Sequence, residues 1–72
     1  MEEIVRAVLG ALERGDWERV RLLLHPYLHW REPDVALRGR RNVLERLADG
    51  PPPEPPDEIE LRDGQIYRWT RT

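Results

Sequence analysis

The chain has 72 residues, of which 12 are basic and 14 are acidic, and its net charge is −2. A chain of this length forms one domain with a thin core, so we treat residues 1–72 as a single domain whose stability needs support. Cysteine is absent, which excludes disulfides and thiolate zinc sites. A partner subunit is the remaining support, and we predict a homodimer.

The charges and the apolar residues disfavour several other partners. Acidic and basic residues are well mixed along the chain, so we expect no nucleic-acid partner. No apolar run approaches the length of a membrane span, and the segment MEEIVRAV is acidic where a signal peptide is basic. We therefore predict a cytoplasmic protein without a membrane partner. Two histidines alone are a poor metal site, and we predict no metal and no cofactor.

The first 24 residues predict two short helices. Residues 2–14 place a stripe of apolar side chains on one helical face: Ile4, Val5, Val8, Ala11 and Leu12. Gly15 is suited to the left-handed residue after a helix, and Asp16 to the N-cap of the next. The second helix ends at His25-Pro26, because the residue before proline avoids the helical region. Its inward residues are Trp17, Val20, Leu23 and Leu24.

The segment HPYLHWREPD contains the first predicted strand, Tyr27 to Arg31, which Glu32-Pro33-Asp34 closes with turn residues. Alternation along a strand separates two faces. Leu28, Trp30 and Glu32 are expected to face the helices. Tyr27, His29 and Arg31 are expected to face outward.

The middle of the chain predicts a short extended piece, Val35 to Leu37, and a third helix over residues 39–49. The buried stripe of this helix is Val43, Leu44, Leu47 and Ala48. The following PPPEPP, residues 51–56, is typical of a stiff polyproline II connector. A disordered linker is the alternative interpretation.

The C-terminal segment DEIELRDGQIYRWTRT predicts a hairpin around Asp63-Gly64. A two-residue turn would separate Tyr67 and Trp69 from the apolar residues of the first strand. A three-residue turn over residues 62–64, with Gly64 left-handed in a bulge, brings Glu58 opposite Arg68 and groups the apolar side chains. The apolar face expected from this second register is Ile59, Leu61, Tyr67 and Trp69, and we favour it.

Together these elements predict an α+β fold, with three helices packed on a small antiparallel sheet. Three segments of the sequence resemble the nuclear transport factor 2-like (SnoaL-like, cystatin-like α+β cone) superfamily: ALERGDWERVRLLLHPYLHWREPD, ALRGRRNVLERL and IELRDGQIYRW. The resemblance implies a curved sheet that wraps around the helices to enclose a pocket, with a homodimer interface on its other face. Members usually carry another hairpin where PPPEPP stands, so this chain resembles a shortened member.

The resemblance gives Glu32 a candidate catalytic role, because it matches the position of a pocket-facing general base in ketosteroid isomerase-like relatives. Leu28 and Trp30 would provide the apolar surroundings that raise the pKa of such a carboxyl group. The alternative is a glutamate at the end of a strand, paired with Arg38 or Arg40, and we prefer it because no second catalytic group is evident.

The remaining candidates concern ligand binding. The predicted ligand-binding residues are Trp30, Leu28, Trp17, Arg38 and Trp69, although aromatic residues in so small a domain also serve its core and dimer contact. The segment LRGR, residues 37–40, is suited either to binding an anion or to starting the third helix. His25 and His29 are four apart, but Pro26 breaks the helix that would align them on a metal.

These observations support two functions. We favour a dimeric binding or interaction module that holds a small apolar organic ligand. The alternative is an isomerase-, cyclase- or hydrolase-like enzyme that uses Glu32 as general base on such a compound.

Overall fold

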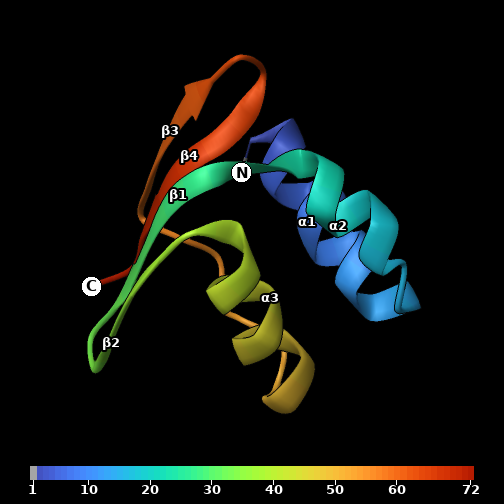
Figure 1. Cartoon of the computed structure of the whole chain (residues 1–72), viewed down its shortest axis with the longest axis horizontal. Helices are drawn as coiled ribbons and strands as arrows, with labels where there is room; N and C mark the ends of the chain where they lie inside the picture. The colour runs from blue at the N-terminus through green and yellow to red at the C-terminus, as the bar shows by residue number, and fades with distance from the viewer. Residues whose placement is uncertain (1) are drawn as a thin grey trace.

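The computed structural model describes residues 2–72, and within this range it contains three helices and a four-stranded sheet. The α+β class is therefore confirmed (Figure 1). The elements in chain order are α1 (Glu3–Arg14), α2 (Trp17–Leu23), β1 (Leu24–Glu32), β2 (Val35–Arg38), α3 (Arg40–Asp49), β3 (Glu58–Arg62) and β4 (Gln65–Thr70).

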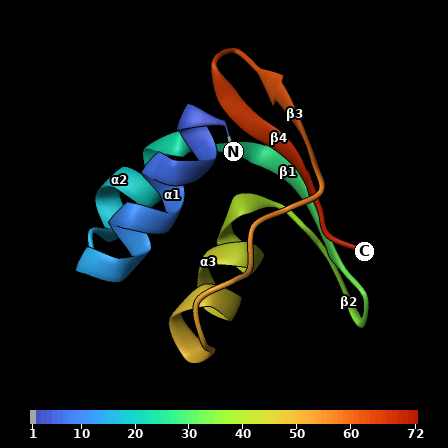
Figure 2. The ribbon, with the colours of Figure 1, turned by 180° about the vertical axis from the view of Figure 1, so that it is seen from behind.

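The helices lie on one face of the sheet. Figures 1 and 2 show α1 and α2 as a pair beside the upper part of the sheet and α3 beside its lower part, while the other face has no helix over it. We call this uncovered side the outer face. Among residues 2–72, no helix is long and apolar enough to cross a membrane.

The predicted junction between the first two helices is confirmed, whereas α2 ends before the predicted His25-Pro26 and β1 begins before the predicted Tyr27. Gly15 is left-handed, with φ 70°, and its backbone N–H bonds to the carbonyls of Ala11 and Leu12. Asp16 caps α2 by accepting a hydrogen bond from the backbone N–H of Arg19. α2 ends at Leu23, and β1 begins directly at Leu24, before the proline. No loop separates α2 from β1, and Leu24, the first residue of the strand, is fully buried.

The sheet is mixed, with strand order β2-β1-β4-β3. The expectation of an entirely antiparallel sheet is wrong for one pair, because β1 and β4 run parallel. This arrangement places the more apolar strand of the hairpin in the centre of the sheet, where Ile66 and Trp69 are fully buried. β3, which carries Glu58 and Glu60, forms the edge, a position that charged side chains protect from unwanted pairing.

The register of the hairpin differs from the favoured prediction. Asp63 and Gly64 both have positive φ, 55° and 77°, and Arg62 pairs with Gln65, so the turn has two residues. The bulge lies further along β4, at Tyr67, because Glu60 pairs with Arg68 and Leu61 with Ile66. The extra residue lets Ile66 and Trp69 both face the core.

Two consequences of that register contradict the prediction. Tyr67 does not join Trp69 on the core side, since its ring contacts His25 and His29 instead. Arg68 lies opposite Glu60, at 3.7 Å, and not opposite Glu58. Leu61 does lie on the predicted face, because it pairs with the core residue Ile66, although its side chain is 49% exposed.

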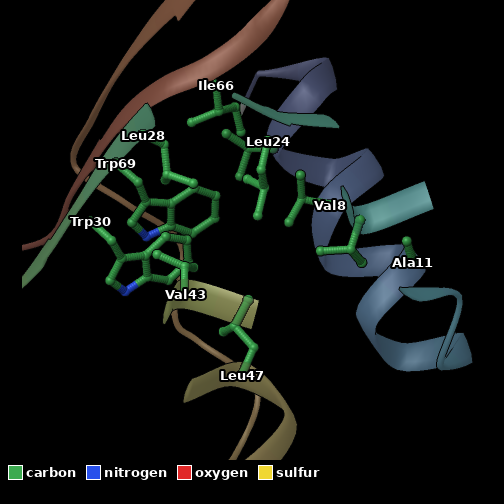
Figure 3. Packing of buried hydrophobic residues seen from close by; sticks show 11 residues of the cluster. Val8, Ala11, Leu24, Leu28, Trp30, Val43, Leu47, Ile66 and Trp69 are labelled. Atoms are coloured by element: carbon green, nitrogen blue, oxygen red, sulfur yellow. The ribbon is translucent and has the colours of Figure 1, made fainter. Parts of the chain in front are cut away.

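The core is built around two stacked indole rings. The rings of Trp30 and Trp69 lie 4.5 Å apart between centroids at an interplanar angle of 9° (Figure 3). Two helical residues that were predicted to face inward are exposed instead: Ala48 at the end of α3, and Trp17, at 40%, at the start of α2. The buried cluster is Val5, Val8, Ala11, Val20, Leu24, Leu28, Trp30, Val43, Leu47, Ile66 and Trp69.

The proline-rich arm of residues 51–56 has no helix or strand, but the chain is held at its far end. Glu54 accepts a hydrogen bond from the guanidinium of Arg71 at 3.2 Å. The carboxylate of Asp57 accepts bonds from both the backbone N–H and the hydroxyl of Thr72, each at 2.7 Å. These contacts support the interpretation of the arm as an ordered connector.

Candidate functional site

The predicted inward direction of Glu32 is confirmed, because it lies on the core side of β1 beside Trp30. Its Oε1 accepts a hydrogen bond from the indole Nε1–H of Trp30 at 2.7 Å. Its Oε2 lies 3.8 Å from the guanidinium of Arg71, and the side chain is only 16% exposed. The expected partners Arg38 and Arg40 are wrong. Arg71 takes their place because its backbone N–H bonds to the carbonyl of Arg31 and brings the chain end beside β1.

The cavity beside Glu32 has a volume of about 170 Å³ and is lined partly by the arm residues Pro51, Pro52 and Pro53. Ligand pockets usually have volumes of about 300–1,000 Å³. Both carboxylate oxygens of Glu32 already have partners in the protein. The arrangement therefore works as a structural contact that joins β1 to the chain end.

The five predicted ligand-binding residues do not form one site. Leu28, Trp30 and Trp69 are between 0% and 1% exposed and belong to the core. Trp17 begins α2 at the end of the helical pair that points away from the sheet (Figure 1). Arg38 is exposed and lies at the end of β2.

The outer face contains a larger concavity, about 510 Å³ in volume. Residues that lie directly opposite each other on paired strands share one face of a sheet. His29 lies opposite both Arg38 and Arg68, and Arg31 lies opposite Ala36 and Thr70. We call this concavity the outer groove, and its lining residues are His29, Trp30, Arg31, Ala36, Leu37, Arg38, Arg68 and Thr70.

Two arginines in the outer groove have no bound carboxylate. Among the described residues 2–72, the guanidinium groups of Arg31 and Arg38 make no ion pair or hydrogen bond. Arg68 is different, since Glu60 lies 3.7 Å from it. The β1 and β2 side of the groove is thus positively charged, and acidic residues lie on the β3 side.

An aromatic cluster continues the outer groove toward the hairpin. The ring of Tyr67 lies 5.1 Å from that of His25 and 5.3 Å from that of His29, and His25 lies 5.9 Å from Tyr27. The guanidinium of Arg62 lies over the Tyr67 ring, 3.9 Å from its centroid. Tyr27 itself is 75% exposed.

The histidines in this cluster are not arranged for a metal. The Nδ1 atom of His25 accepts a hydrogen bond from the backbone N–H of Tyr27 at 3.0 Å, so it is not a free ligand atom. Its Nε2 atom lies 3.9 Å from the carboxylate of Asp63. Within residues 2–72, no group of three or more histidine, cysteine, aspartate or glutamate side chains could hold a metal ion.

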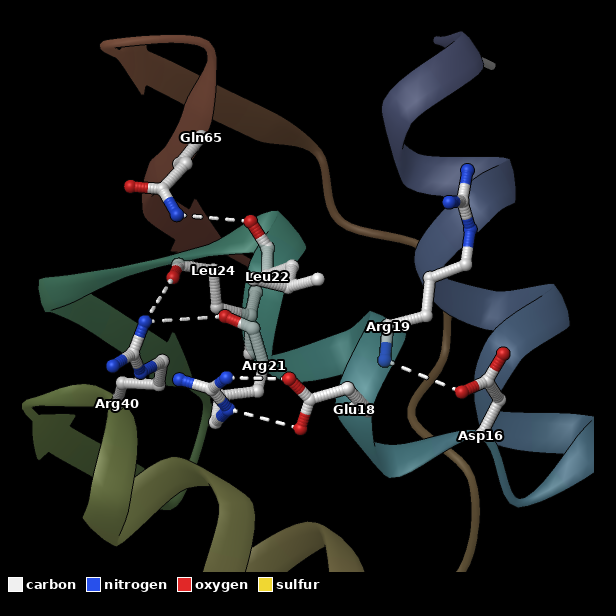
Figure 4. A network of polar contacts seen from close by, with 8 residues as sticks. All are labelled: Asp16, Glu18, Arg19, Arg21, Leu22, Leu24, Arg40 and Gln65. Atoms are coloured by element: carbon white, nitrogen blue, oxygen red, sulfur yellow. Dashed lines mark hydrogen bonds and ion pairs between the residues drawn. The ribbon is translucent and has the colours of Figure 1, made fainter.

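The arginines on either side of Gly39 serve different parts of the fold. Gly39 has φ 88°, and its N–H bonds to the carbonyl of Leu28. Arg40 donates hydrogen bonds to the carbonyls of Arg21 and Leu24, at 3.2 and 3.4 Å (Figure 4). Arg21 lies in the last turn of α2 and Leu24 is its C-cap, where a helix leaves carbonyls without partners. Only Arg38 of the LRGR segment remains available to an anion.

The sequence predicts part of the outer groove. Strand alternation places His29 and Arg31 outward, as observed. Arg38 was expected in a ligand site of a different kind. The favoured hairpin register already places Arg68 on the face away from Trp69, but opposite Glu58, whereas the structure places it opposite Glu60 and beside His29.

Comparison with known proteins gives no match, since neither a protein-family model nor a curated protein nor a solved structure matches this chain. The resemblance to the nuclear transport factor 2-like superfamily stays a prediction.

Proposed function

We propose that this protein is a binding module that holds an anionic ligand in the outer groove. The observation that carries the proposal is the pair of arginines, Arg31 and Arg38, on a sheet face without a helix over it and without carboxylate partners in residues 2–72. A guanidinium group matches the planar shape of a carboxylate or phosphate and can donate two parallel hydrogen bonds to it.

Other features of the outer groove support this proposal. Its volume of about 510 Å³ lies within the usual range for ligand sites. The hydroxyl of Thr70 and the imidazole of His29 are further hydrogen-bonding groups in the lining. The proposal changes the expected ligand from an apolar compound to one that carries phosphate or carboxylate groups.

Isothermal titration calorimetry with pyrophosphate and citrate tests the proposal. We expect binding that weakens about tenfold in Arg31→Gln and in Arg38→Gln, because each variant removes a charged hydrogen-bond donor. Arg41→Gln is the matched control, since Arg41 lies on α3 with its side chain 93% exposed and should bind as the unchanged protein does. Equal affinity in all four proteins, or no binding at all, would contradict the proposal.

A second candidate is a homodimer formed through the outer face. Glu58, which has no ion pair among residues 2–72, and Glu60, which pairs with Arg68, lie on β3, at the opposite edge of the sheet from Arg38. A two-fold axis parallel to the strands would place β2 of one protomer over β3 of the other, so that opposite charges meet. The thin core of a 72-residue chain also favours a partner subunit.

Sedimentation velocity tests the homodimer. We expect a dimer at micromolar concentration that Arg31→Glu converts largely to monomer, with Arg41→Glu as a control that leaves the dimer intact. A folded monomer at all concentrations would exclude this candidate.

Catalysis by Glu32 is the weaker proposal, because its carboxylate already contacts Trp30 and Arg71 and its neighbouring cavity is small. The cytoplasmic location remains a prediction from the sequence.

A further inference from the structure

We propose that the ligand of the outer face is a single-stranded nucleic acid, whose phosphates contact Arg31 and Arg38 and whose bases stack on the neighbouring aromatic rings. This inference rests on the proposed anion binding and names the ligand class. The observation behind it is that the basic groove and the aromatic cluster are continuous. His29 belongs to both, because it lines the groove and contacts the ring of Tyr67.

The shape of the surface favours a strand over a small free anion. β1 carries outward side chains from Tyr27 to Arg31, and a strand advances about 3.3 Å per residue, so these residues span about 13 Å. The charged and aromatic groups therefore form an elongated platform on an open sheet. A chain with repeated phosphates and bases can contact all of it, whereas pyrophosphate contacts only the arginines.

The chemistry of the platform suits unpaired bases. Aromatic rings bind bases through their faces, and this stacking tolerates any base sequence. Tyr27, at 75% exposure, offers an accessible ring, and the Arg62 guanidinium over Tyr67 offers a planar cation. Bases inside a duplex are already stacked on each other and cannot use these surfaces, so a single strand is the expected form.

The fold separates charges that are mixed in the sequence. The even mixing of 12 basic and 14 acidic residues disfavours nucleic acid when the chain is read linearly. In the folded protein, however, Arg31, Arg38 and the two histidines lie on one side of the outer face. Glu58 and Glu60 lie on the edge strand β3, opposite Thr70 and Arg68, so we expect the phosphates to lie over β1 and β2 while the bases extend toward Tyr27 and Tyr67.

Fluorescence anisotropy at low salt provides the test. The probes are a labelled twelve-nucleotide oligo-uridine RNA, an oligo-thymidine DNA of the same length and a DNA duplex, with unlabelled inorganic polyphosphate as competitor. We expect both single strands to bind more tightly than the duplex. Arg31→Gln and Arg38→Gln should each reduce the slope of log affinity against log salt by about 0.7, the value for one phosphate contact on a single strand.

Tyr27→Ala separates stacking from simple charge attraction. We expect it to weaken oligonucleotide binding about tenfold and to leave polyphosphate binding unchanged. Trp17→Ala is the control, because it removes another exposed aromatic ring, on α2, away from the outer face. Circular dichroism of each variant verifies the fold.

The outcomes distinguish the two proposals. Equal binding of polyphosphate and oligonucleotides, with no effect of Tyr27→Ala, would refute the nucleic-acid inference and leave anion binding standing. Tighter binding of the duplex would also refute it. If neither polyphosphate nor any oligonucleotide binds, both proposals fail.

Discussion

Glu32 shows how one side chain can satisfy a sequence pattern and still serve a different purpose. It occupies the inward position that the resemblance assigns to a general base. Its partners are the indole N–H of Trp30 and the guanidinium of Arg71. The sequence predicts its direction, because strand alternation is local. It does not predict Arg71 as the partner, because Arg71 is far from Glu32 in the sequence and only the folded sheet brings the two residues together.

The first prediction compares two substitutions of Glu32. Glu32→Ala leaves the buried indole N–H of Trp30 without its acceptor. The core would then contain two indole N–H groups without partners among the described residues, since that of Trp69 already has none. We expect a loss of about 1–3 kcal/mol in the free energy of unfolding. Glu32→Gln keeps an acceptor oxygen and should cost less than about 1 kcal/mol. Urea denaturation measures both, and equal losses would show that the Trp30 contact does not contribute.

The second prediction concerns Asp57. Hydrogen bonds from the backbone N–H and hydroxyl of Thr72 lower the pKa of its carboxyl group below the ordinary value. A carboxyl group with a lowered folded-state pKa stabilises the protein above its unfolded-state pKa, about 3.9, and this contribution is lost as the pH falls through the folded-state value. Asp57→Asn cannot titrate, so its stability should approach that of the unchanged protein as the pH falls from 6 toward about 2.5. A difference in unfolding free energy that stays constant over this range would contradict the prediction.

At the scale of elements, features that neighbouring residues determine can be predicted from the sequence, whereas features that depend on residues far apart in the chain cannot. The boundary between α1 and α2 depends on neighbouring residues, and Gly15 and Asp16 have the expected roles. The parallel pairing of β1 with β4 depends on the position beside the sheet at which α3 and the proline-rich arm place the hairpin. No residue of the hairpin encodes which strand will lie beside β1, so this pairing could not be predicted.

The bulge at Tyr67 has the same origin. Its location is fixed by packing, because Ile66 and Trp69 are three apart and can both face the core only if one residue between them is extra. The sequence correctly indicates that a bulge is needed and places it three residues too early, at Gly64.

The third prediction uses two glycines in different elements. Gly64 has φ 77° in the turn between β3 and β4, so Gly64→Ala should destabilise the protein by about 1 kcal/mol. Gly10 lies inside α1, where a new methyl group would meet only the movable end of Arg14 at 3.3 Å. Gly10→Ala should stabilise the protein by up to about 1 kcal/mol, because alanine favours the helix. Chemical denaturation gives both values, and opposite signs are the expected result.

At the scale of the whole molecule, the sheet decides what the protein can bind. Its inner face is filled by helices and by the stacked indoles of Trp30 and Trp69, where the resemblance predicts a pocket. Its outer face holds Arg31 and Arg38, which have no ion pair in the part of the chain that the structure describes. Composition and net charge could not indicate this separation, because it arises from the strand order.

The fourth prediction follows from the use of Arg31 and Arg38 in both proposed functions. If a second protomer brings its β3 glutamates to these arginines, an anion in the outer groove competes with it. Binding to the monomer alone draws the equilibrium toward monomer by mass action. We therefore expect phosphate to shift the dimer toward monomer more strongly than chloride at the same ionic strength.

Sedimentation at several protein concentrations measures this shift. Arg41→Gln is the control, and its dimer should respond to phosphate as that of the unchanged protein does. If phosphate and chloride act equally, simple screening explains the salt effect. If phosphate strengthens the dimer instead, the anion is shared between the two protomers, and the arginines of both outer faces must meet around it.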